Sequence, residues 1–409
     1  MKQVPTLSLA LVVAGAMLVG LGVTTSGTAS ATEPRSSSPV PPPYQDRYNA
    51  LRSQLSNFAA LPGRTVPHSP TIIASGLEPA NGNLMRPGVL NTNLLSTATT
   101  LAHRMKTLGE TGVTIQVNFP LLLSSFPDSA EYTTFYRDIA RVVHQEGLTL
   151  AVEQNPLFGN ISTLPVASFY AGLTLQSYAA ADHQMAQTVI DVMHPTYLSI
   201  LTEPDTYTAV IHQPDINLNS PTIGAQFVNL VMDGLQKDGT LVGGGTGSWI
   251  NPSYDQLLLA QTPIDYLDMH VFPIAQSDLS NMTSQVSSAA AAHKTIVVTE
   301  CWLYKQSSGG TPLDNVQAAP DEQKIETYSF WEPLDQQFLT TMVRYARSKK
   351  FAFVSPFSTL NFFAYQTWTS ALDAQSSQLV RAAFNQKVQA ALSSGGLSAV
   401  GKTYQHLAA

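Results

Sequence analysis

Cysteine is almost absent from this chain of 409 residues, which contains only Cys301. No disulfide can therefore form within one molecule, and no pair of cysteines has the spacing of a metal or redox site. Without covalent cross-links, stability has to come from a buried apolar core, which favours a large compact domain.

Charge is also scarce. Charged residues make up 12% of the chain, the net charge is −7, and no basic run offsets it. Nucleic acid is therefore not an expected partner. Serine, threonine, asparagine and glutamine fill the polar positions instead, which suits a polar, uncharged ligand.

Several catalytic signatures are missing from the sequence. No glycine-rich dinucleotide turn follows the first predicted strand, no Gly-x-Ser-x-Gly elbow occurs, and the histidines lack the His-Glu-x-x-His spacing of zinc enzymes. We expect no cofactor and no bound metal. Residues 396–403 match the phosphate-loop pattern, but a predicted helix precedes them and only six residues follow. We interpret this match as a coincidence, because a phosphate loop needs a strand before it and a full helix after it.

Long apolar runs are confined to the N-terminus. Lys2 precedes an apolar stretch at 7–23, and small residues at 29–31 resemble a cleavage site. We predict a signal peptide at 1–31, with an uncleaved anchor as the alternative, and a secreted or periplasmic protein. No integral membrane span is expected after signal removal. Residues 32–43, rich in proline and serine, predict an extended linker.

The remainder, residues 44–409, shows strand-like and helical patterns in alternation. Strands are predicted at 71–76, 113–118, 148–153, 196–202, 240–244, 265–271, 295–299 and 351–356. Helices are predicted at 44–60, 97–108, 130–146, 166–193, 225–236, 277–293, 333–348 and 374–392, with a weaker one at 252–260.

Such continuous apolar strands are typical of parallel strands buried on both faces. Eight of them favour a single (β/α)8 TIM barrel over an open doubly wound sheet, which is the alternative. The barrel would carry an N-terminal helix and a long loop, residues 307–330, after its seventh strand.

Two predicted strands run into a glutamate, Glu203 in one case and Glu300 in the other. In a barrel, the segments after the strands build the active site. A pair of carboxylates brought together there could hydrolyse a glycosidic bond. Alternatively, either glutamate caps a loop or forms a salt bridge. The other carboxylates at predicted strand ends are Glu78, Glu153 and Asp268.

All four tryptophans follow predicted strand ends: Trp249, Trp302, Trp331 and Trp368. We interpret them as a groove in which indole rings stack on sugar faces, although core packing is the alternative. Aromatic residues that could extend the groove are Tyr254, Phe272, Tyr304 and Tyr365.

These segments resemble clan A of the retaining (β/α)8 glycoside hydrolases, which includes cellulases, β-mannanases and endo-galactanases. In that clan the acid/base glutamate ends strand four, commonly within Asn-Glu-Pro, and the nucleophile ends strand seven. Thr202-Glu203-Pro204 matches the first segment and Thr299 to Trp302 the second. Asp268 to Pro273 resembles the clan's His-x-Tyr-x-Pro segment on strand six.

The resemblance implies hydrolysis of a β-linked carbohydrate by double displacement, with Glu300 as nucleophile and Glu203 as acid/base. Their carboxyl groups would lie about 5–5.5 Å apart. We expect a raised pKa at Glu203, caused by apolar surroundings and by the charge of Glu300.

Two positions depart from the clan pattern: Thr202 replaces the asparagine that binds the sugar 2-hydroxyl, and Phe272 replaces the tyrosine that bonds the nucleophile. Another donor, His270 or Tyr304, would then have to keep Glu300 ionised. We assign substrate hydrogen bonding to Glu153 and Asn155. The departures leave open a barrel that binds sugar without cleaving it, and a barrel enzyme of other chemistry built on Glu153 or Asp268.

Overall fold

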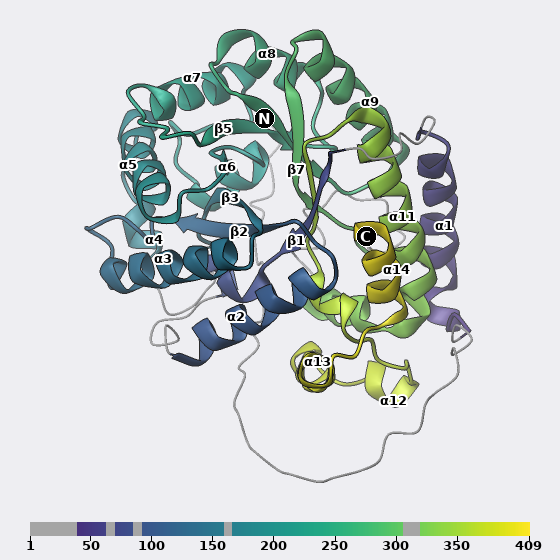
Figure 1. Ribbon diagram of the computed structural model, residues 1–409. Coiled ribbons are helices and arrows are strands. Elements are labelled where there is room, and N and C mark those ends of the chain that lie inside the picture. The colour runs from purple at the N-terminus through teal and green to yellow at the C-terminus, as the bar shows by residue number, and fades with distance from the viewer. Residues whose placement is uncertain (1–38, 63–69, 85–91, 159–165, 306–319) are drawn as a thin grey trace, which may run out of the picture.

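Eight parallel strands form a closed ring at the centre of the molecule (Figure 1). The computed structural model describes residues 39–62, 70–84, 92–158, 166–305 and 320–409. Each strand is hydrogen-bonded to the next in the chain, and β1 pairs with β8 to close the barrel. The strands are β1 (Ile72–Gly76), β2 (Gly112–Phe119), β3 (Thr149–Pro156), β4 (Tyr197–Ser199), β5 (Leu241–Gly247), β6 (Tyr266–Val271), β7 (Thr295–Cys301) and β8 (Phe353–Pro356). The predicted (β/α)8 barrel is confirmed.

Helices surround the ring on its outer side (Figure 1). They are α1 (Gln45–Ala59), α2 (Thr92–Thr107), α3 (Ser129–Gln145), α4 (Val166–Tyr170), α5 (Leu175–Met193), α6 (Pro204–Ile211), α7 (Pro221–Met232), α8 (Ser253–Gln261), α9 (Gln276–Ala291), α11 (Glu332–Lys349), α12 (Ser370–Asp373), α13 (Ser377–Ser394) and α14 (Ala399–Ala408). The single helix predicted at 166–193 was wrong, because Gly172 has a φ of +78° and Thr174 caps α5. Helices α6 and α14 were not predicted.

The N-terminal part of the described chain packs against the barrel. Val40 contacts the main core, and Pro42–Tyr44 forms a 3-10 turn that leads into α1. Phe58 of α1 packs against Phe338 of α11, with ring centroids 6.3 Å apart. The end of the predicted linker therefore belongs to the folded domain. The predicted signal peptide at 1–31 and the linker up to residue 38 lie outside the described residues.

No helix among the described ranges is both long enough and apolar enough to cross a membrane. The phosphate-loop match at 396–403 runs into α14, so residues 399–403 are helical. Tyr404 of this helix donates a hydrogen bond to the carbonyl oxygen of Ala74 in β1.

The interior of the barrel is filled by a layer of side chains from six strands: Ala74, Ala151, Tyr197, Tyr266, Val297 and Phe353. Gly243 on β5 makes room for this layer, because a Cβ there would lie 2.3 Å from the Tyr266 ring. The glycine run at 243–245 lies entirely within β5.

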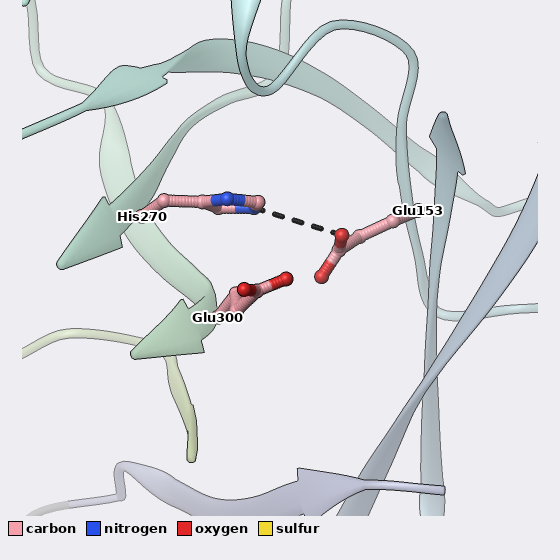
Figure 2. Close-up of side chains that lie close together, drawn as sticks. All are labelled: Glu153, His270 and Glu300. Carbon is pink, nitrogen blue, oxygen red and sulfur yellow. Dashed lines mark ion pairs between the residues drawn. The ribbon is translucent and has the colours of Figure 1, made fainter. Parts of the chain in front are cut away.

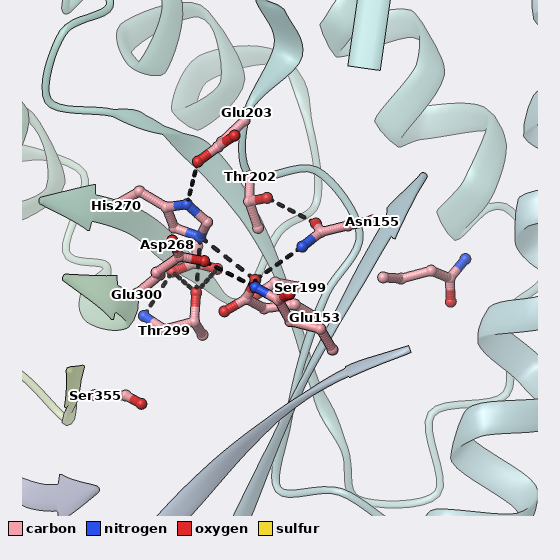
Figure 3. Close-up of polar contacts among 12 residues, drawn as sticks. Glu153, Asn155, Ser199, Thr202, Glu203, Asp268, His270, Thr299, Glu300 and Ser355 are labelled. Atoms are coloured by element: carbon pink, nitrogen blue, oxygen red, sulfur yellow. Dashed lines mark hydrogen bonds and ion pairs between the residues drawn. The ribbon is translucent and has the colours of Figure 1, made fainter. Parts of the chain in front are cut away.

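Strand β7 contains an irregularity just before Glu300. Its pairing with β6 runs from Asp268↔Val297 to His270↔Glu300, so β7 has one residue more than β6 over this interval. The pairing with β8 shows the same extra residue on β7. An added residue disturbs the alternation of side chains between the two faces of a strand. Thr299 and Glu300 are neighbours in sequence, yet both turn into the barrel mouth (Figure 3).

A carboxyl group outside the barrel mouth gives a test of the packing. Asp182 of α5 is fully buried, and burial raises its pKa from 3.8 to about 8. A carboxyl whose pKa is raised on folding binds its proton more tightly in the folded state, so stability falls as pH rises between these two values.

We expect Asp182→Asn to gain stability relative to the wild type as pH increases. Between about pH 5 and about pH 8 the difference in unfolding free energy should change by at least about 1 kcal/mol in favour of the variant. Denaturant unfolding at the two pH values measures it. Asp191→Asn, at an exposed position of the same helix, is the control. A constant difference for Asp182→Asn would contradict the expected buried, protonated carboxyl.

Candidate active site

Polar side chains converge at the mouth formed by the carboxyl ends of the strands (Figure 3). They come from β2 (Gln116), β3 (Glu153 and Asn155), the segment after β4 (Thr202 and Glu203), β6 (Asp268 and His270) and β7 (Thr299 and Glu300). Ten residues were predicted from the sequence as site residues. Six of them belong to this polar group: Glu153, Asn155, Thr202, Glu203, His270 and Glu300.

The imidazole of His270 lies at the centre of the group and is only 1% exposed. Its Nδ1 lies 2.8 Å from Oε1 of Glu203. On the other side of the ring, Nε2 lies 3.6 Å from Oε2 of Glu153. One buried ring therefore links a glutamate of β3 to the glutamate that precedes α6. Glu203 was predicted to follow its strand directly, but β4 ends at Ser199.

Glu153 and Glu300 face each other beside this ring (Figure 2). One carboxyl oxygen of Glu153, one ring nitrogen of His270 and one carboxyl oxygen of Glu300 all lie within 4.8 Å of one another. The amide nitrogen of Gln116 bridges the two carboxyl groups, lying 2.8 Å from Oε2 of Glu300 and 3.2 Å from Oε2 of Glu153. Two acidic groups thus share one neutral donor.

The hydroxyl of Thr299 connects His270 to a further carboxylate below the mouth. It donates to both oxygens of Asp268, at 2.9 and 2.7 Å. The same hydroxyl oxygen lies 3.3 Å from His270 Nε2. Because its single hydrogen is directed to Asp268, the oxygen accepts a hydrogen bond from the ring.

These contacts shift the proton affinities of the group. Burial lowers the pKa of His270, but the charges of Glu153, Glu203 and Glu300 outweigh it, so the pKa lies well above its ordinary value. Burial raises the pKa of Glu153 to about 7. Burial also raises the pKa of Glu300 well above its usual range, and the charges of Glu153 and Glu203 add to this effect.

Glu203 behaves differently from the expectation. Burial alone raises its pKa, but the hydrogen bond from His270 and the charge of that ring together hold the pKa below its ordinary value. Thr206 donates a further hydrogen bond to Glu203 at 2.7 Å. The predicted raised pKa of Glu203 is therefore wrong, because the hydrogen bond and charge of His270 outweigh burial.

Thr202 and Asn155 form a second hydrogen-bonded layer. Thr202 is 1% exposed and donates to Oδ1 of Asn155 at 2.9 Å, while Nδ2 of Asn155 donates to Glu153 at 2.9 Å. Tyr207 of α6 also donates to Asn155, at 3.1 Å. Thr202 is thus placed to orient Asn155 rather than to face the opening. Glu153 was predicted to end its strand. This was wrong, because β3 continues to Pro156.

Three aromatic rings lie side by side along the mouth. Trp249 stacks on Phe272 with centroids 5.4 Å apart, and Phe272 lies 4.6 Å from the ring of Tyr304. Trp249 and Tyr304 are half-buried, whereas Phe272 is 2% exposed and supports the other two. The indole nitrogen of Trp249 donates to Oδ2 of Asp205 at 2.8 Å, which fixes the ring close to Glu203.

The predicted four-tryptophan groove is wrong for two of its members. Trp302 and Trp331 have no exposed surface. Trp302 packs between β7 and α11, with its ring 6.2 Å from Phe338, and Trp331 stacks on Tyr48 of α1. Both indoles stabilise the contact between the barrel and its helices, so the packing alternative holds for them.

Within the described residues, Glu153, His270 and Glu300 form a group whose donor atoms could surround one cation. Each side chain is already engaged, because Nδ1 of His270 bonds Glu203 and Gln116 bonds both glutamates. We interpret the group as a proton-sharing network.

Gln116, which bridges Glu153 and Glu300, was not predicted as a site residue. Strand β2 reads Thr114, Gln116 and Asn118 at alternate positions between apolar neighbours, which is the signal of a strand with one polar face. Thr299 and Asp205 were also missed as contributors. A water-sized cavity of about 10 Å³ lies beside Gln116 and Glu153 and is also lined by Glu78 and Asn81.

The barrel is similar in fold to solved structures of glycoside hydrolases. No family model and no curated protein matches its sequence. A family 5, subfamily 18 glycoside hydrolase from Bifidobacterium longum subsp. longum, in complex with Manβ1-4GlcNAc, has 10% identity and a TM-score of 0.49, with 83% of this chain and 78% of that chain covered.

Two further solved structures show a similar likeness. The exo-β-1,4-mannosidase of Opitutaceae bacterium strain TAV5 has 14% identity and a TM-score of 0.47, with 79% of this chain covered. The chain spans 60% of that enzyme's length. A family 26 β-mannanase from Bacteroides ovatus has 11% identity and a TM-score of 0.42, with 84% and 94% covered. At such identities the likeness concerns the fold alone.

A buried ion-pair network anchors the segment that carries Tyr304. The next residue, Lys305, is 1% exposed and its Nζ contacts Oδ1 of Asp335. Its Nζ also lies 3.2 Å from Oε2 of Glu326 and 2.6 Å from the carbonyl oxygen of Leu303. These bonds hold the chain after β7 against α11.

We expect Lys305→Met to destabilise the protein by about 3–5 kcal/mol, because it leaves buried carboxylates without their cation. The double variant Lys305→Met, Asp335→Leu should recover part of this loss, since it removes the stranded charge as well. Denaturant unfolding of both variants measures the effect. A double variant less stable than Lys305→Met would contradict this explanation.

Proposed function

We propose that the protein is an exported glycoside hydrolase that cleaves a β-linked oligosaccharide or polysaccharide by retaining double displacement. The observation that carries the proposal is the gathering of Glu203, which precedes α6, and Glu300, near the end of β7, around one buried imidazole at the barrel mouth. Export rests on the sequence at 1–31 alone.

In this mechanism Glu300 attacks the anomeric carbon while Glu203 gives a proton to the leaving oxygen. Glu203 then takes a proton from water, and the hydroxide so formed releases the sugar with retained configuration. Glu300 is 7% exposed and the side chain of Glu203 is 19% exposed, so both retain a surface toward the opening. The half-buried Trp249 offers a stacking surface beside them.

A sugar-binding barrel without turnover is the second candidate. It is favoured by the low pKa of Glu203, which leaves the proposed acid ionised in the absence of substrate. Thr202 and Phe272, at positions where the clan has asparagine and tyrosine, point the same way.

Activity on a panel of aryl β-glycosides and β-linked polysaccharides separates the two candidates. We expect hydrolysis by the wild type and a loss of roughly a thousandfold or more in kcat for Glu300→Ala, because no covalent intermediate can form. The anomer released first, followed by NMR, should keep the configuration of the substrate. Equal rates for wild type and Glu300→Ala would rule out the proposed nucleophile, and binding without turnover in the wild type would favour the second candidate.

The acid/base role has its own signature. Glu203→Gln should lose roughly 10²–10⁴-fold in kcat on substrates with poor leaving groups, because the departing oxygen needs a proton. On dinitrophenyl glycosides, whose leaving group needs none, the loss in the first chemical step should be much smaller. Equal losses on both kinds of substrate would contradict the assignment.

The aromatic wall can be tested through Trp249. Trp249→Ala should raise KM by roughly two- to tenfold with a smaller change in kcat, because stacking of an aromatic ring on an apolar face contributes about 0.5–1.5 kcal/mol. Trp249→Phe, which keeps a flat ring but cannot bond Asp205, is the matched control. An unchanged KM for the alanine variant would show that this ring does not contact substrate.

A further inference from the structure

The hydrogen bonds of the site leave one of the two proposed catalytic glutamates without the proton that the reaction requires. Double displacement requires a proton on Glu203 and a negative charge on Glu300. The hydrogen bonds described above instead place Glu203 as an acceptor beside His270. The site therefore needs a route by which protons reach their catalytic positions.

The hydrogen bonds of His270 indicate that both ring nitrogens carry a proton. Nδ1 donates to Glu203 at 2.8 Å. Nε2 faces the hydroxyl oxygen of Thr299, whose own hydrogen is directed to Asp268. With a donor at each nitrogen the ring is an imidazolium, and the proton next to Glu203 is already in place.

Ionising both Glu153 and Glu300 at such close range in a buried site would cost a large electrostatic free energy. Glu153 has no exposed surface, and its Oε1 has no hydrogen-bond partner, while its Oε2 accepts from Gln116 and Asn155. Figure 2 shows the two carboxyl groups directed toward each other. A proton on Oε1 of Glu153 would satisfy that atom and donate toward Glu300.

We propose that Glu153 and His270 are the positioning residues that set the protons of the two reacting glutamates. Glu153 retains one proton beside Glu300, so that Glu300 stays anionic. His270 passes the other proton to Glu203 when substrate arrives. This inference rests on the proposed glycosidase function and deepens it.

The proton count supports a simple transfer. Before binding, the group comprises the His270 imidazolium, the Glu203 anion, and one proton shared by Glu153 and Glu300, giving a net charge of −1. In the reactive state the N–H bond at Nδ1 of His270 breaks and an O–H bond forms at Oε1 of Glu203. His270 and Glu203 are then neutral and Glu300 is anionic, so the net charge is again −1.

Substrate binding supplies the reason for the transfer. The side chain of Glu203 is 19% exposed before binding. A sugar that covers it removes its remaining water, and desolvation favours the neutral pair over the ion pair. No proton has to enter from solvent, since the donor and acceptor atoms already form one hydrogen bond.

Titratable groups that face Glu153 come from several elements. They are Asp268, His270 and Tyr266 from β6, Glu300 from β7, Tyr207 from α6, and Glu78 across the small cavity. Burial of Glu153 raises its pKa to about 7, so its proton is lost as pH rises through neutrality. Once Glu153 is ionised, His270 is held as a cation between anions, and Glu203 no longer receives its proton.

A test without substrate uses NMR of histidine labelled with ¹⁵N, with His270→Gln to identify the resonances. In the wild type at about pH 7, both nitrogens of His270 should be protonated. Glu153→Gln should lower the pH at which the ring loses its proton, because one neighbouring negative charge is gone. A neutral ring in the wild type, or a titration unaffected by Glu153→Gln, would overturn the inference.

The kinetic test measures kcat/KM against pH for the best substrate of the panel. Between about pH 6 and about pH 8 the wild type should lose roughly tenfold, as Glu153 ionises. Glu153→Gln, which cannot ionise, should lose less than about threefold, with KM nearly unchanged. At higher pH, loss of the proton shared by His270 and Glu203 then limits kcat/KM. A raised KM with an unchanged pH profile would instead assign Glu153 to substrate binding.

Controls separate the possible failures. Glu153→Asp should restore a fall at neutral pH, and Asp182→Asn, a buried carboxyl outside the mouth, should leave the pH profile unchanged. Activity is measured with and without a chelator, and an activity that the chelator abolishes would overturn the proton assignment in favour of a bound cation. If the NMR titrations are as expected but no substrate is hydrolysed, the proposed function is contradicted and this inference is not. If substrate is hydrolysed through Glu300 but Glu153→Gln changes neither the titration of His270 nor the pH profile, this inference is contradicted and the proposed function is not.

Discussion

The hydrogen bond between His270 and Glu203 is the interaction on which the rest of the site depends. The barrel mouth brings four carboxyl groups, those of Glu153, Glu203, Asp268 and Glu300, around one imidazole. Such crowding of acids is tolerable in a buried space only when some charge is neutralised. The cationic ring neutralises one negative charge directly, and its position decides which glutamate is ionised and which keeps a proton.

The barrel accounts for this arrangement through simple geometry. Side chains of parallel strands alternate between the interior and the helix layer, so Tyr266, Asp268 and His270 on β6 all point inward. The bulky members of this series fill the interior, and the polar ones near the strand ends meet the glutamates of β3 and β7. The same strands thus provide both the packed core and the polar mouth, with Gly243 leaving space for the largest ring.

The fold could be predicted from the sequence because each strand is a nearly continuous apolar run. Glu203 and Glu300 could be predicted as site residues because they interrupt such runs. The lowered pKa of Glu203 could not be predicted, because the residues next to Glu203 in the sequence do not show that His270 forms a hydrogen bond with it. The role of Trp302 was misjudged for a related reason. Its position after β7 is visible in the sequence, but its orientation toward α11 depends on packing between distant segments. Gln116 was detectable from the alternation in β2 and was overlooked.

The extra residue in β7 has a consequence for anyone who transplants this chemistry. The glutamate faces the mouth only because the strand gains a residue before it on both of its edges. If the same side chain were grafted at the equivalent height of an evenly paired strand, it would point toward the surrounding helices. A designer who transplants Glu300 must therefore transplant this backbone distortion too, together with the threonine that precedes it.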